Sequence, residues 1–153
     1  QLDRFMIKLS MGYPDPASEI AILKDRQGAN PLNDVKQVVD GKDIVMMQEE
    51  TDNLHMDDAI IEYITMLSFA TRQNPLIELG VSPRGSIALA GMSKAKAYIS
   101  GRTYVTPEDV QSIFKDVAGH RIILNPRAKI SSVTIDEVID NIFRTVPVPR
   151  AMR

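Results

Sequence analysis

The sequence predicts a mainly α-helical bundle with one or two short strands. Three observations lead to this fold class. Apolar residues recur at helical spacing in several segments, signals for the start of a helix precede these segments, and glycine or proline follows them. A chain of 153 residues is long enough to bury the core of one domain.

The first third of the chain predicts one strand and two helices. Residues 5–9 form a short apolar run before Gly12 and Pro14, which is typical of a buried strand that ends in a turn. A helix is expected to begin after Asp15, where proline and acidic residues suit a first turn, and to end before Gly28. A second helix is expected over residues 42–53, after a loop.

Two further helices are predicted in the middle of the chain. Residues 57–73 place apolar side chains at helical spacing, and Asn74-Pro75 ends that helix. Ser82-Pro83 begins the next one, which Gly101 ends. Along this helix we expect a narrow stripe of mostly small residues to allow close approach of a neighbour: Ala88, Met92, Ala95 and Ile99.

The last third predicts two more helices around a short strand. Thr106-Pro107 is followed by two acidic residues, which is a strong signal for the start of a helix. Residues 120–124 are expected to form a short strand. The final helix has apolar residues from Ile135 to Val146 at the same spacing and ends at Pro147.

Composition excludes several classes of function. A formal net charge of −2 gives no reason to expect nucleic-acid binding or attraction to an anionic membrane. The absence of cysteine removes disulfides and thiolate chemistry, and suits a reducing compartment. No apolar stretch is long enough to cross a bilayer, and no signal peptide opens the chain. We therefore expect a cytoplasmic protein without membrane insertion.

Two arginines are the strongest candidates for a functional role. Arg84 follows Ser82-Pro83 in the first turn of a predicted helix, where unpaired backbone donors already favour an anion. Arg4 lies near the start of the chain. Arginine presents a planar fork of donors that suits phosphate oxygens. The alternatives are that Arg84 is a solvated side chain beside a good cap, and that Arg4 pairs with Asp3 or another nearby acid.

The sequence contains no phosphate-binding loop. No Gly-x-x-x-x-Gly-Lys-Ser/Thr run is present, and the first residue is Gln1 instead of methionine. We interpret the chain as a fragment of a nucleotide-binding protein whose phosphate site lies elsewhere.

Several motifs, taken in order, resemble the C-terminal part of a MoxR-type AAA+ ATPase. They are Leu2-Asp3-Arg4-Phe5, Ala70-Thr71-Arg72, Val81-Ser82-Pro83-Arg84, the run from Gly101 to Val110, and His120-Arg121-Ile122. The resemblance covers nearly the whole chain. It implies that residues 1–13 are the last strand and hinge of the ATPase core and that residues 14–153 are the helical AAA+ lid domain.

The resemblance also implies roles for individual residues. Arg4 matches the arginine finger, which reaches the nucleotide of a neighbouring subunit, and Arg84 matches the sensor-two arginine of the lid. Tyr13 and Pro14, at the hinge, are expected near the adenine, although a packed hinge is the alternative. The remaining arginines at matching positions are expected to form structural ion pairs: Arg72, Arg102 and Arg121.

The function implied by the family is ATP-driven, chaperone-like assembly or maturation of protein complexes. It implies ATP and Mg²⁺ as cofactors of the longer protein, a homo-oligomeric ring expected to be a hexamer, and partners with von Willebrand factor A domains. The isolated chain, without the Walker A and Walker B motifs, is expected to be inactive in ATP hydrolysis.

The alternative from another class is a non-enzymatic helical adaptor or a winged-helix-like nucleic-acid module. The net charge and the lack of a strongly basic helix argue against the nucleic-acid module. We expect no metal site, because His55 and His120 are far apart in sequence and the aspartates near His55 suit a helix start. Glu108 and Asp109 are likewise expected to be helix-start acids.

Overall fold

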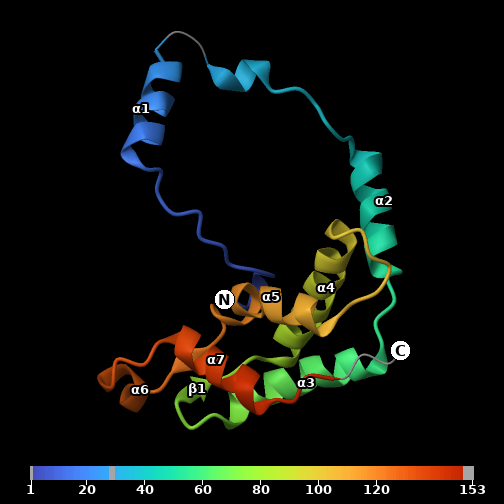
Figure 1. Cartoon of the computed structure of the whole chain (residues 1–153), viewed down its shortest axis with the longest axis vertical. Coiled ribbons are helices and arrows are strands. Elements are labelled where there is room, and N and C mark those ends of the chain that lie inside the picture. Colours follow the sequence, from blue (N-terminus) through green and yellow to red (C-terminus); the bar gives the residue numbers. More distant parts are fainter. Residues whose placement is uncertain (1, 28–29, 150–153) are drawn as a thin grey trace. The chain divides into compact units, whose positions relative to one another are not determined.

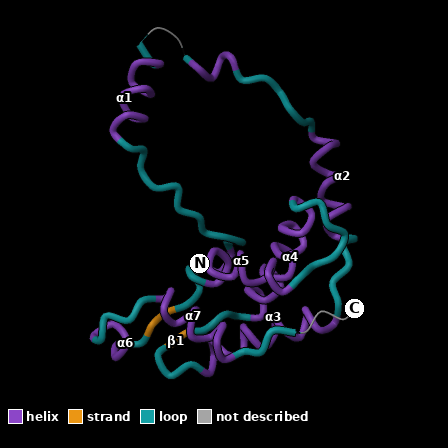
Figure 2. Tube along the Cα trace, viewed as in Figure 1, coloured by secondary structure: helices purple, strands orange, loops and turns teal. Residues whose placement is uncertain are grey.

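The computed structural model describes residues 2–27 and 30–149, which divide into two compact units. One unit comprises the N-terminal residues up to Lys8 together with residues 49–149, and the other comprises residues 9–48. Within the first unit, Figure 1 shows helices gathered around one core, and Figure 2 shows the strands as one small patch. No described helix is long and apolar enough to span a bilayer.

The unit of residues 9–48 contains the helices predicted for the first third of the chain. Helix α1 (Pro16–Asp25) begins after Asp15, whose carboxylate accepts a hydrogen bond from the Ser18 backbone N–H at 2.7 Å. A short 3₁₀ helix η2 (Pro31–Asp34) follows, and α2 (Gly41–Asp52) begins in this unit and ends in the other. No described residue between 9 and 48 is buried, so this segment has no core of its own.

The other unit is built from four main helices. They are α3 (Asp58–Gln73), α4 (Pro83–Ile99), α5 (Pro107–Ala118) and α7 (Ile135–Thr145). The short helix α6 (Pro126–Ile130) lies between α5 and α7 in the chain. Their apolar faces form one core, in which the side chains of Leu67, Leu89, Phe114 and Ile142 are almost fully buried. Phe114 also packs edge-on against Phe143, with ring centroids 5.4 Å apart. The fold is therefore the mainly α-helical bundle that the sequence predicts.

The helix-start signals form the caps that were expected of them. Ser82 caps α4, and Thr106 forms a capping box with Asp109 at the start of α5. Gly101, after the end of α4, has a φ of +70°, a left-handed conformation that glycine adopts without strain. The predicted apolar positions of α3, α5 and α7 all face the core or its edge.

The part of the chain that the structure describes has two short strands, and the first predicted strand is absent from it. Strands β1 (Ile77–Leu79) and β2 (Ile123–Leu124) pair antiparallel, with Ile77 opposite Leu124, which confirms a strand within residues 120–124. Residues 5–9 form no strand. That prediction was wrong because the backbone of this segment bonds to the Arg121 side chain and to the Asp116 carbonyl, not to a neighbouring strand.

The predicted stripe on α4 differs from the buried line by one to two residues. The buried line is Gly85, Leu89, Ser93 and Ala97, whereas Ile99 is 82% exposed. Small residues follow both lines, so periodicity alone does not distinguish them. The first position of the buried line requires glycine, because a Cβ added at Gly85 would lie 2.6 Å from Val81 Cγ1.

Replacement of Gly80 by alanine is predicted to destabilise the bundle. The added Cβ would lie 2.8 Å from backbone atoms of Thr71 and Arg72, so the loop before α4 must shift, at a cost of about 1–3 kcal/mol. Gly91→Ala is the matched control, because nothing lies within 4 Å of its Cβ position inside α4. The control is expected to raise the unfolding free energy by about 0.5–1 kcal/mol. Urea unfolding of both variants measures the difference, and equal effects would contradict this packing.

The ion pair between Arg102 and Asp109 is predicted to make the free energy of unfolding depend on pH in the acid range. Burial raises the pKa of Asp109, but hydrogen bonds from Arg102 and Thr106 outweigh it and hold the pKa below its ordinary value of 3.8. A lowered carboxyl pKa stabilises the fold at neutral pH, and this contribution is lost as the pH falls below about 4. Unfolding free energies measured from pH 6 to pH 2.5 should therefore fall less steeply for Asp109→Asn than for the unmodified protein. Parallel curves would refute the coupling.

Candidate functional site

The N-terminal turn and the start of α4 meet at the Asp3 carboxylate. Asp3 lies in the 3₁₀ helix η1 (Leu2–Arg4). Its carboxylate accepts hydrogen bonds from the Ser82 hydroxyl at 3.0 Å and from the Arg121 Nε at 3.0 Å. Three segments that are far apart in sequence are thus joined at one acidic side chain.

Arg121 anchors the rest of the N-terminal segment. Its side chain, only 2% exposed, donates from Nη2 to the carbonyl oxygens of Asp3 and Phe5 and from Nη1 to that of Met6 at 3.2 Å. Nη1 also donates to the Val117 carbonyl near the end of α5. The Lys8 N–H extends the attachment by donating to the Asp116 carbonyl at 2.9 Å. Residues 3–8 are therefore fixed to the C-terminal end of α5.

The start of α4 is fixed by Ser82 and by the loop that precedes the helix. The Ser82 hydroxyl oxygen accepts from the Gly85 N–H at 3.2 Å while donating to Asp3, so one side chain both caps the helix and joins the N-terminal turn. In the preceding loop, the Arg72 Nε donates to the Val81 carbonyl at 2.7 Å. The Val81 N–H donates to the Thr71 hydroxyl oxygen at 2.9 Å. Arg84 is therefore displayed from a fixed helix start.

Arg4 directly follows Asp3, Arg84 lies two residues after Ser82, and both arginines are exposed. Neither side chain forms a hydrogen bond or ion pair with another residue in the described ranges 2–27 and 30–149. The alternative in which Arg4 pairs with Asp3 is wrong, because Asp3 is bound to Arg121 and Ser82 instead. Two unpaired guanidinium groups near a helix start suit an oxyanion such as a phosphate.

The other arginines stabilise the fold. Arg102 pairs with Asp109 and Arg121 pairs with Asp3, which confirms the prediction of an ion pair for each, although neither partner was predicted. The ion pair expected for Arg72 is absent among the described residues, because its side chain bonds to a backbone carbonyl. Asp109 is a helix-start acid as expected, since it completes the capping box of α5.

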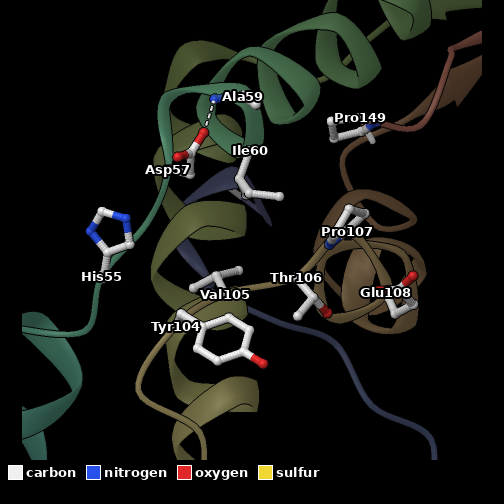
Figure 3. Close-up of a pocket in the computed structure, with 10 residues that line it drawn as sticks. All are labelled: His55, Asp57, Ala59, Ile60, Tyr104, Val105, Thr106, Pro107, Glu108 and Pro149. Carbon is white, nitrogen blue, oxygen red and sulfur yellow. Dashed lines mark hydrogen bonds between the residues drawn. The ribbon is translucent and has the colours of Figure 1, made fainter. Parts of the chain in front are cut away.

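A separate pocket of about 430 Å³ lies where α3 and α5 begin (Figure 3). Its lining includes His55, Asp57, Tyr104 and Glu108 but neither Arg4 nor Arg84. Figure 3 shows the Asp57 carboxylate bonded to the Ala59 N–H, at 2.9 Å, so this acid caps α3. The described residues hold no group of three or more histidine and acidic side chains placed to bind a metal ion.

Tyr13 and Pro14, which the sequence predicts to lie at a hinge, belong to the unit of residues 9–48. Both are exposed, and Tyr13 fully so. Their role beside an adenine stays a prediction, as does the division of the chain at residue 13.

Sequence reasoning missed the joint itself. It singled out Arg4 and Arg84, considered Asp3 only as a possible partner of Arg4, gave Ser82 only the role of a helix cap, and assigned only an unspecified ion pair to Arg121. Asp3 and Arg121 are 118 residues apart, so no local spacing predicts their contact. The available signal was the presence of all three residues within the motifs of the family resemblance.

Comparison with known proteins gives consistent results. The family model described as AAA lid domain matches residues 69–142. The uncharacterized protein YeaC of Bacillus subtilis is 39% identical to this chain. The match covers 97% of this chain and 47% of YeaC. Chaperone MoxR1 of Mycobacterium tuberculosis is 31% identical over 98% of this chain and 42% of its own length.

A crystal structure of a candidate ATPase from Cytophaga hutchinsonii is similar to the whole bundle. It superimposes with a TM-score of 0.87 at 29% identity, covering 97% of this chain and 48% of that protein. The chain thus spans about half the length of the relatives it matches. The sequence motifs, the helical fold and these relatives agree, and the chain belongs to the MoxR-type AAA+ family.

Proposed function

We propose that this chain is the lid portion of an ATP-hydrolysing MoxR-type protein that assembles or matures other protein complexes. The observation that best supports this is that Arg4 and Arg84, which follow the hydrogen-bonded residues Asp3 and Ser82, are exposed and have no partner among the described residues. In this proposal Arg4 is the arginine finger that acts on the nucleotide of a neighbouring subunit, and Arg84 is the sensor-two arginine that links nucleotide state to lid position.

The residues present fit the phosphates of ATP but do not form a Mg²⁺ site. Arg4 and Arg84 supply positive charge and hydrogen-bond donors, which neutralise the charge that develops on a transferring phosphoryl group. The described residues contain no cluster of acidic side chains that would bind a cation, and the sequence has no glycine-lysine phosphate loop. ATP and Mg²⁺ therefore belong, in this proposal, to a core domain outside this chain.

The proposal includes a homo-oligomeric ring, a hexamer, in the cytoplasm. A finger that acts in trans requires a neighbouring subunit, which is why ring assembly follows from the role given to Arg4. Proteins with von Willebrand factor A domains are the partners that membership of the family suggests. The mycobacterial relative is named a chaperone, which agrees with a function in which the protein acts on other proteins.

Replacement of Arg4 by alanine in the full-length protein is expected to abolish turnover while leaving ATP binding intact. Loss of an arginine finger lowers kcat about 10³- to 10⁵-fold, because it acts on the transition state and not on the bound nucleotide. Steady-state hydrolysis and equilibrium binding of a fluorescent ATP analogue measure the two effects. Near-normal turnover would remove the finger assignment.

The chain in isolation is expected to hydrolyse ATP no faster than a buffer blank. Its sequence has no phosphate loop, residues 2–27 and 30–149 hold no acidic cluster for Mg²⁺, and positive charge alone does not position water or metal. Phosphate release from a purified sample, with and without Mg²⁺, checks this. Magnesium-dependent turnover that follows the protein through purification would contradict the placement of the nucleotide site outside the chain.

A further inference from the structure

We propose that Arg121, Asp3 and Ser82 act together as a positioning clamp for the Arg4 guanidinium. The inference rests on the finger role proposed above for Arg4. It assigns a function in the reaction to the ion pair between the buried Arg121 and the partly exposed Asp3, which otherwise has only a structural explanation.

The bonds of Arg121 bracket Arg4 on both sides. Its donors reach the carboxylate and carbonyl of Asp3, immediately before Arg4, and the carbonyls of Phe5 and Met6, immediately after it. Four acceptors within four consecutive residues therefore fix the backbone that presents Arg4. The side chain of Arg4 forms no hydrogen bond or ion pair with another described residue and is exposed.

The same clamp also includes the cap of α4, the helix on which Arg84 lies. Asp3 accepts from the Ser82 hydroxyl, and Ser82 caps α4. Gly85, in the first turn of α4, leaves space for the Arg121 side chain, because an added Cβ would lie 3.0 Å from Arg121 Cδ. Both candidate phosphate-contacting arginines are thus presented by backbone that contacts the same clamp. A change in the position of the α4 start would be transmitted to Arg4 through Asp3.

Only arginine suits the central position of this clamp. Its planar fork has five N–H donors and reaches four acceptors on the N-terminal segment in addition to the Val117 carbonyl, whereas lysine has three donors at a single point. Removing the Asp3 charge leaves a buried guanidinium without its counter-ion. Arg121→Lys and Asp3→Asn should both loosen the segment that presents Arg4.

The test measures ATP hydrolysis by Asp3→Asn and Arg121→Lys in the full-length protein. We expect kcat to fall about 10- to 100-fold with KM and nucleotide affinity nearly unchanged, because a small displacement of a catalytic group costs about that much. Arg102→Lys is the matched control: it weakens another arginine–aspartate pair of the same unit, which has no bond to residues 2–8 in the structure. Its kcat should remain within about twofold of the unmodified protein.

A double-mutant cycle separates positioning from a purely structural role. In an Arg4→Ala background, measured by single-turnover hydrolysis, Asp3→Asn should cause no further loss, because the group that it positions is already absent. An equal additional loss in that background, an equal loss in Arg102→Lys, or an unchanged kcat in Asp3→Asn would each overturn the inference. Should Arg121→Lys fail to fold, Asp3→Asn decides the question, since the Asp3 side chain is 43% exposed.

The outcomes also distinguish this inference from the proposed function. If Arg4→Ala retains normal turnover, the finger role itself is refuted. If Arg4→Ala is inactive but Asp3→Asn turns over normally, the finger role stands and the clamp alone is refuted.

Discussion

The ion pair between Arg121 and Asp3 is the interaction on which the candidate site depends. A buried guanidinium needs a counter-ion and acceptors for its N–H groups, and here the N-terminal segment provides both. This requirement brings residues 118 positions apart into contact. It also explains why residues 5–9, although apolar in sequence, adopt no strand: part of their hydrogen-bonding capacity is used by Arg121 and the end of α5.

Most of the helical fold could be predicted from the sequence, because its signals are local. Helix starts such as Thr106-Pro107 contain their own caps, and the apolar spacing of α3, α5 and α7 identifies their buried faces. Helix α4 is the exception, since small residues on two adjacent lines make either face suitable for packing. Its buried face is determined by the close approach of Val81 and Arg121 to Gly85, and that approach depends on tertiary contacts.

The candidate site was predictable only in part, for the same physical reason. Arg4 and Arg84 were identified by residue type and by their motifs, and the structure leaves both exposed and free of partners within its described part. The groups that hold them are an ordinary aspartate, a cap serine and one of several arginines. Their significance lies in contacts across long sequence separations, to which propensity and periodicity are insensitive. A buried arginine whose side chain bonds to four acceptors of one distant short segment becomes recognisable only in three dimensions.

If the clamp positions Arg4 for catalysis, the bonds of Asp3 to Arg121 and Ser82 must persist while Arg4 contacts a nucleotide. An experimental structure of the full-length assembled protein, with a slowly hydrolysed ATP analogue bound, tests this most directly. The account predicts the Arg4 guanidinium within hydrogen-bond distance of the γ-phosphate of a neighbouring subunit's nucleotide. It also predicts that Asp3 remains bonded to Arg121 and Ser82. An Arg4 directed away from every nucleotide, or a separated Asp3–Arg121 pair in subunits whose Arg4 is engaged, would contradict it.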